Sequence, residues 1–197
     1  MALFQKPRRS MLCFYVTVAV TAGVLPLLSG CAGSFEGHRP DTSLASGPLG
    51  SFLLEGHELH PSLWTEQPRS VPDLPTGMVL PKNPNLSNDD AFIEATARGA
   101  SQGRLDGSGI RAALYARYAS DRSSIGIYGL EAESTTDADE REIALRKIWA
   151  YNARLDRAIV RRRDSTLLVV WIWTDGPLPE YWAAAKDSVE KRLGTTR

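Results

Sequence analysis

The chain has 197 residues, enough for one ordinary domain with an additional segment. It carries 23 basic and 23 acidic residues, and this balance argues against a dedicated nucleic-acid-binding protein, which would show a basic excess. Hydrophobic residues make up 43% of the chain and charged residues 23%, as is typical of globular proteins. Two cysteines are too few for a disulfide framework.

Residues 1–30 have the pattern of a secretory signal. Lys6, Arg8 and Arg9 are basic, the segment has no acidic residue, and an almost uncharged apolar run follows at residues 11–28. A basic start, an apolar middle and small residues at the end are typical of such signals. An uncleaved transmembrane anchor is the alternative, because this run is close to the length that spans a bilayer.

The sequence Leu28-Ser29-Gly30-Cys31 closes this leader. It resembles the lipobox of bacterial lipoproteins, in which a leucine and two small residues precede an invariant cysteine. The resemblance covers residues 1–32 only. It implies transfer of diacylglycerol to the Cys31 thiol, cleavage before Cys31 and acylation of the new amino group. Stable anchoring requires more than one acyl chain, so the implied modification makes the membrane a partner of this protein.

Residue 32 is alanine rather than aspartate, which in the better-known sorting systems implies release from the inner membrane. We therefore expect a lipid-anchored cell-envelope protein, in the outer membrane and facing the periplasm. Loss of residues 1–30 would leave 20 basic and 23 acidic residues, a net charge of −3. Such a chain gains nothing overall from anionic lipid, so the acyl chains must supply the membrane affinity.

Residues 31–86 have the composition of a tether. Eight of the twelve prolines lie there, which disfavours long helices and favours extended chain. Three apolar clusters interrupt the segment, and they lie against the domain surface, form a single edge strand or bind a partner: Phe52-Leu53-Leu54, Leu63-Trp64 and Met78-Val79-Leu80. His57 and His60 superficially suggest a metal pair, but no further ligand cluster accompanies them. We expect neither a metal nor another cofactor.

We expect residues 87–197 to form a small two-layer α/β sandwich, with helices packed on a three- or four-stranded sheet. Residues 110–118 suit a helix or a strand, and the need for a third strand favours the strand. The remaining predicted elements are a helix that starts at Ser87, a strand at 123–133, a helix from Thr136 to about Arg161, an interior strand at 166–174 and a helix at 180–193.

The long predicted helix at 136–161 has consequences for topology and for the triple arginine Arg161-Arg162-Arg163. As a crossover between two strands, the helix would make the strands at 123–133 and 166–174 parallel. The arginines would then close the helix, where cations complement the dipole, or contact a phosphate.

Catalytic chemistry has little support in the predicted domain. It contains no histidine or cysteine, which excludes Ser-His-Asp and Cys-His machinery unless the tether donates His57 or His60. Glu131 and Glu133 are two apart on a strand, so they would share a face. They are either an acid–base pair for glycoside cleavage or a solvated strand end, and the second interpretation is favoured. We assign no catalytic residue.

A ligand edge is the alternative use of the acidic residues. If the two strands are parallel, Glu131, Glu133 and Asp175 follow their carboxyl ends and lie at one edge of the sheet, where open α/β sheets bind ligands. The competing interpretation is that residues 136–137 cap a helix and Asp175 closes a turn. Trp171 and Trp173 share a face of the last strand, and they are either core residues, as their apolar neighbours favour, or a stacking platform.

We therefore predict a non-catalytic envelope lipoprotein whose domain binds or positions another envelope component, either a protein or a polysaccharide. The alternatives are a peptidoglycan- or polysaccharide-active hydrolase that uses paired carboxylates, and an accessory subunit of a secretion or transport assembly. An exposed tryptophan pair would favour binding, converging acids in a pocket would favour an enzyme, and a broad apolar patch would favour a subunit.

Overall fold

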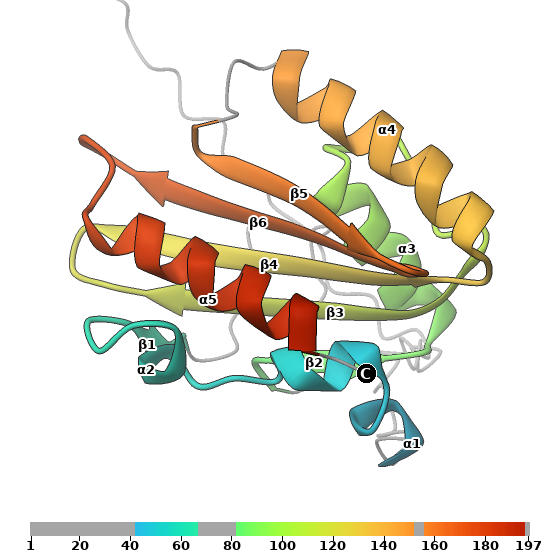
Figure 1. The fold of residues 1–197 in the computed structure, drawn as a ribbon, viewed down its shortest axis with the longest axis horizontal. Helices are drawn as coiled ribbons and strands as arrows, with labels where there is room; N and C mark the ends of the chain where they lie inside the picture. The colour runs from blue at the N-terminus through green and yellow to red at the C-terminus, as the bar shows by residue number, and fades with distance from the viewer. Residues whose placement is uncertain (1–41, 67–81, 152–155, 196–197) are drawn as a thin grey trace, which may run out of the picture. The chain divides into compact units, whose positions relative to one another are not determined.

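The computed structural model describes residues 42–66, 82–151 and 156–195 (Figure 1). Cys31 and the predicted signal lie outside these ranges, as does the cluster Met78-Val79-Leu80. The helices of the described chain are α1 (Thr42–Ala45), the 3-10 helix η1 (Pro48–Phe52), α2 (Gly56–Leu59), α3 (Asp90–Ala100), α4 (Thr135–Tyr151) and α5 (Tyr181–Thr195). The strands are β1 (Trp64–Thr65), β2 (Asn85–Ser87), β3 (Ile110–Ala119), β4 (Ser123–Ala132), β5 (Ala158–Arg163) and β6 (Thr166–Thr174).

One antiparallel sheet organises the domain. The order of its strands is β1-β3-β4-β6-β5, and the short β2 also pairs with β3. The predicted α/β class is confirmed, and so is the strand at 110–118, which forms a hairpin with β4. The predicted interior strand at 166–174 is β6, which lies between β4 and β5. Helix α5 occupies the segment predicted for the last helix.

The predicted long helix and the parallel pairing are wrong. Helix α4 ends at Tyr151, and Ala158–Arg163 forms the edge strand β5 instead of a last helical turn. A two-residue turn at Asp164 and Ser165 joins β5 to β6, and Asp164 adopts a φ of 51°, a conformation that aspartate tolerates in hairpin turns. Because this hairpin inserts an extra strand, β4 and β6 are antiparallel.

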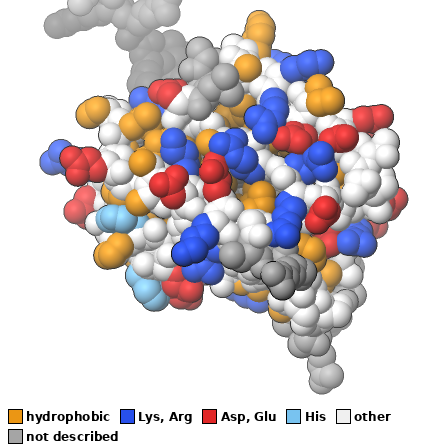
Figure 2. All heavy atoms as spheres, viewed as in Figure 1, with side chains coloured by type: hydrophobic (Ala, Val, Ile, Leu, Met, Phe, Trp, Pro, Cys, Tyr) orange, Lys and Arg blue, Asp and Glu red, His pale blue; other side chains and the backbone are white. Residues whose placement is uncertain are grey.

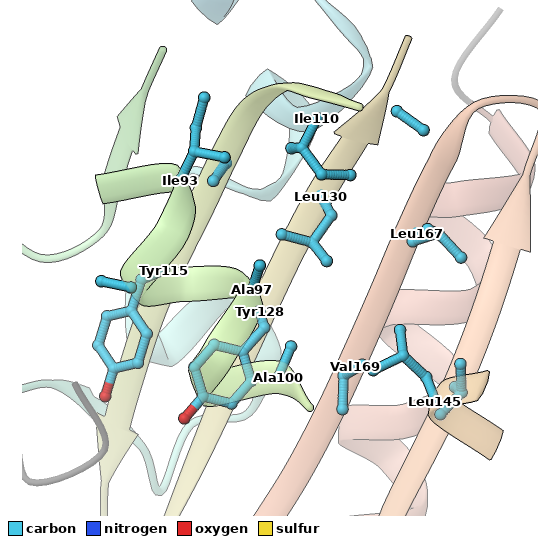
Figure 3. Packing of buried hydrophobic residues seen from close by; sticks show 14 of the residues in the cluster. Ile93, Ala97, Ala100, Ile110, Tyr115, Tyr128, Leu130, Leu145, Leu167 and Val169 are labelled. Carbon is cyan, nitrogen blue, oxygen red and sulfur yellow. The ribbon is translucent and has the colours of Figure 1, made fainter. Parts of the chain in front are cut away.

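Helices cover both faces of the sheet, so the domain has three layers and not the two expected (Figure 1). We call the side of α3 and α4 the first face and the side of α5 and η1 the second face. Figure 3 shows Ile93, Ala97 and Ala100 of α3 packed over the first face, with Tyr115 and Tyr128 side by side on neighbouring strands. Both faces of β6 are buried, which explains why its sequence is apolar throughout.

The domain begins well before the predicted boundary at residue 87. Part of the predicted tether folds onto the second face, where six of its apolar side chains are buried: Leu49, Phe52, Leu54, Leu59, Leu63 and Leu86. The Tyr118 hydroxyl donates a hydrogen bond to the Leu54 carbonyl at 3.2 Å, and burial raises the pKa of this phenol. Among the interpretations of the apolar clusters, docking on the domain holds for 52–54 and for Leu63, whereas Trp64 is 50% exposed and lies in the short strand β1, which pairs with β3 as the edge-strand interpretation expected. Proline density here marks turns and a 3-10 helix rather than a free linker.

The start of α3 differs slightly from the prediction. Asp89 caps the helix, because its carboxylate accepts hydrogen bonds from the N–H groups of Ala91 and Phe92 at 3.0 and 3.1 Å. Ser87, the predicted cap, instead accepts a hydrogen bond from the Asp89 N–H at 3.0 Å.

In the part of the chain that the structure describes, no helix combines the length and the apolar character that a bilayer crossing needs.

Candidate functional site

Glu131 and Glu133, the first two residues of the predicted ligand edge, lie in different surroundings. Glu131 is only 6% exposed near the end of β4, and its carboxylate accepts a hydrogen bond from the guanidinium of Arg111 on β3. Glu133 is exposed beyond the strand, where its N–H donates to the Gly109 carbonyl at 2.8 Å. One carboxylate is therefore buried and paired with a cation, while the other faces solvent.

Asp175 does not join them. In the antiparallel register of β4 and β6, Glu131 lies opposite Thr166, whereas Ser123 lies opposite Thr174, the residue before Asp175. Glu131 and Asp175 are thus at opposite ends of the sheet. The predicted ligand edge is wrong, because it required parallel strands.

The tether does bring a histidine back to the domain, but not beside a nucleophile–acid pair. The His60 ring lies 5.3 Å from the Tyr181 ring, and its Nδ1 accepts the Ser62 N–H at 3.2 Å. Tyr181 in turn shares hydrogen bonds with the hydroxyls of Ser120 and Ser123. Over the described ranges, no group of three or more histidine, cysteine, aspartate and glutamate side chains is arranged to hold a metal ion.

The arginine run lies on the edge strand β5, where its members bind acidic groups and a carbonyl. Arg161 pairs with Glu190 of α5, and Arg162 bonds to Glu142 of α4 at 3.0 Å. Burial opposes ionisation of Glu142, but hydrogen bonds from Arg146 and Arg162 outweigh it and lower its pKa. This network therefore stabilises the fold above the ordinary glutamate range and weakens as the pH falls.

The α5 face carries both signs of charge. Figure 2 shows basic and acidic side chains interspersed over it, and the pairs Arg161–Glu190 and Arg192–Glu58 join neighbouring elements there. Interspersed charges protect an edge strand from pairing with another chain. We read this face as a solvated surface of the domain.

The tryptophans of β6 divide between the two predicted roles. Trp171 is 9% exposed and packs with Tyr128, with ring centroids 6.3 Å apart. Trp173, two residues on and on the same face, is 51% exposed. The expectation that the pair is core holds for Trp171 only.

The strand register places a third tryptophan, Trp64, in line with Trp173. Trp64 of β1 pairs with Ala119, Ala119 with Ser124, and Ser124 with Trp173. Directly opposed residues of antiparallel strands share a face, so these four residues form one row across the first face. Trp64 is 50% exposed. The row therefore begins and ends on a half-exposed indole, with two small residues between.

The next row on this face supplies polar groups and a buried indole. It contains Arg117, Gly126 and Trp171. A side chain at Gly126 would collide with the Trp171 ring, since a Cβ there would lie 2.2 Å from Cε2. The glycine thus lets the indole lie flat against the sheet, and the Arg117 guanidinium lies 5.8 Å from its centre.

Arg117 is held in place by several groups. Its Nε lies 2.7 Å from a carboxylate oxygen of Glu66, and its Nη2 donates to the Ser124 hydroxyl at 3.3 Å. Asn83 accepts the Arg117 N–H at 2.9 Å and donates to the Glu66 carbonyl at 2.7 Å. The arginine is fixed between the two rows, and the Glu66 side chain is 41% exposed beside it.

We call these two rows the tryptophan face, which consists of Trp64, Ala119, Ser124, Trp173, Arg117, Gly126, Trp171 and Glu66. Three buried atoms of this set have no hydrogen-bond partner among the described residues: Glu66 Oε2 and Arg117 Nε, which face each other at 2.7 Å as an ion pair, and Trp171 Nε1. Most buried polar atoms do have such a partner, so the Trp171 N–H is an unsatisfied donor within the described part of the chain.

Sequence reasoning identified Trp171 and Trp173 but missed Trp64 and Arg117 as parts of one site. The signal for Trp64 was weak, because it stands in a proline-rich segment and its partner Ala119 is 55 residues away.

Comparison of the chain with family models, with curated proteins and with solved structures finds no match.

Proposed function

We propose that this protein is a non-catalytic, lipid-anchored component of a bacterial cell envelope, whose domain binds another envelope component through the tryptophan face. The observation that carries the proposal is the row that ends in Trp64 and Trp173, two half-exposed indoles on one face of the sheet. Large aromatic side chains with apolar rings and a polar N–H are typical of binding surfaces. The lipobox at residues 28–31 supports the anchoring.

The alternative functions have less support. A hydrolase would need Glu131 and Glu133 as a working pair, but Arg111 engages one and the other is a solvated strand end. An assembly subunit would present a broad apolar patch. The exposed large apolar residues outside the tryptophan face are few among the described residues and are dispersed over α4 and the loop after β6: Ile143, Tyr151 and Leu178.

The anchoring is tested at Cys31. In cells, Cys31→Ser is expected to leave an unprocessed, unacylated precursor, because serine lacks the thiol that receives the diacylglycerol. The measurements are labelling with a radioactive or clickable fatty acid and the mass of the N-terminus. Cys13→Ser, which changes the other cysteine, is the matched control and should mature normally. Wild-type cleavage and fatty-acid labelling of Cys31→Ser would contradict the lipoprotein assignment.

The binding surface is tested by photo-crosslinking in living cells. A diazirine amino acid at position 173 is expected to yield adducts with other envelope material after illumination. The same amino acid at Ile143, which is 54% exposed on α4, is the control and should yield far fewer. If position 173 gives no more adducts than position 143, the tryptophan face is not the binding surface and the proposed function fails.

A further inference from the structure

We infer that the tryptophan face binds a polysaccharide, the glycan strand of peptidoglycan, with sugar rings stacked on Trp64 and Trp173. This inference rests on the proposed function and names its ligand. The first step is the geometry of the row. Three strand spacings of about 4.8 Å separate the backbones of the two tryptophans, or about 14 Å in total. Flat rings repeated along a linear polymer fit two flat indoles set apart in a line.

The second step is the floor between the indoles. Ala119 and Ser124 occupy it, and both side chains are small. Ser124 is only 4% exposed and the Arg117 guanidinium lies against its hydroxyl, so a chain of sugar rings would pass over these residues and Arg117 on its way from one tryptophan to the other. Pyranose rings present C–H groups on their faces and hydroxyls around their rims. The faces suit the indoles, and the hydroxyls need polar partners close by.

The third step is the set of polar groups beside the row. Arg117, whose side chain is 18% exposed, offers only donors, and the Glu66 carboxylate, on a side chain that is 41% exposed, offers acceptors. A sugar hydroxyl both donates and accepts, so it can bond to either member of the Arg117–Glu66 pair.

The same features argue against other ligands. A protein interface has a contiguous apolar centre that is depleted of charge, whereas this face has a charged pair beside the row of separated indoles. A nucleic acid would need several unpaired cations for its phosphates, whereas Arg117 is already paired with Glu66. A neutral, hydroxyl-rich chain needs neither a broad apolar surface nor excess positive charge.

The position of the domain is also compatible with this ligand. Eleven residues lead from Cys31 to Thr42, the first described residue. A chain of that length reaches at most about 40 Å from a lipid-anchored end. A domain held within that distance of the membrane on the periplasmic side faces the cell wall.

The test is co-sedimentation of the full-length protein, solubilised in detergent micelles, with purified peptidoglycan sacculi stripped of protein. Wild type is expected to bind. Trp64→Ala and Trp173→Ala should each lower the apparent affinity about tenfold, because each removes one stacking contact. The double variant should bind too weakly to sediment, and Trp173→Tyr should recover part of the loss, since a phenol ring also stacks. High salt should change binding little.

The control variants are Ile143→Ala and Tyr151→Ala, which remove similarly exposed side chains from α4 and should bind as wild type does. Unchanged thermal unfolding of the tryptophan variants shows that they are folded. If the folded double variant sediments as wild type does, or if wild type does not bind sacculi, the inference fails. Cross-links from position 173 to proteins alone would also overturn it, while leaving the proposed binding function intact.

Discussion

Replacing Phe52 by alanine is expected to lower the free energy of unfolding by about 3–5 kcal/mol, the usual cost of deleting a buried phenylalanine ring. Phe52 is 0% exposed, although it lies in a proline-rich segment with the composition of a linker. It belongs to the cluster on the second face that includes Tyr118 and Ile127. The lost contacts would leave a cavity between η1 and the sheet, and a loss of this size would threaten the whole domain.

Urea denaturation of the full chain measures this effect, and His57→Ala is the control, because that side chain is exposed in the same segment. Limited proteolysis gives a second measurement. The wild-type segment 48–65 should resist cleavage, while Phe52→Ala should be cut there early. If Phe52→Ala unfolds at the same urea concentration as wild type, the segment is not part of the folded core. The tether would then extend up to β2, and the domain would begin there.

The fold was predictable where its pattern is local. The run 166–174 is apolar on both faces, and the alternation of Ile125 and Ile127 continues into a hairpin, so these strands are visible without tertiary information. The α/β class and the last helix follow from the same local patterns. These elements form the frame of the sheet.

The edge strand β5 was not predictable from periodicity. By spacing alone, Leu145, Ile148 and Ile159 fit one helical stripe. However, α4 ends at Tyr151, and Ile159 belongs to the strand β5, which begins at Ala158. The overlooked signal was Asp164, which follows a run of strand-compatible residues and forms the turn into β6. This one error reversed the relative direction of β4 and β6, and with it the whole predicted ligand edge.

The candidate site depends on contacts that are distant in sequence. Trp173 is visible as one of two tryptophans on a strand, but its exposure depends on how far the helices extend over the first face. Trp64 joins it only because β1 adds to the edge of β3, an event that proline-rich composition conceals. Packing of this kind, and the fixing of Arg117 by Asn83 and Glu66, follows from the tertiary fold rather than from a local motif.

Replacing Gly126 by valine is expected to lower the free energy of unfolding by about 1–3 kcal/mol, the typical cost of overpacking a core. A Cβ at this position would lie 2.2 Å from Cε2 of Trp171, so the indole must leave the sheet. Valine itself suits a strand, which makes the collision rather than backbone propensity the cause. The displaced ring would also lose its stacking on Tyr128 and its position near Arg117.

Urea denaturation again measures the stability, and the near-ultraviolet circular dichroism of the native protein reports the tryptophan environment. Gly176→Ala is the matched control, because a Cβ there would meet no atom within 4 Å; it should leave both measurements unchanged. At temperatures where Gly126→Val remains folded, binding to sacculi should also fall, because Trp171 and Arg117 no longer hold their places beside Ser124. A variant with wild-type stability and an unchanged tryptophan spectrum would show that the indole does not rest on Gly126, and that the second row of the tryptophan face is arranged differently.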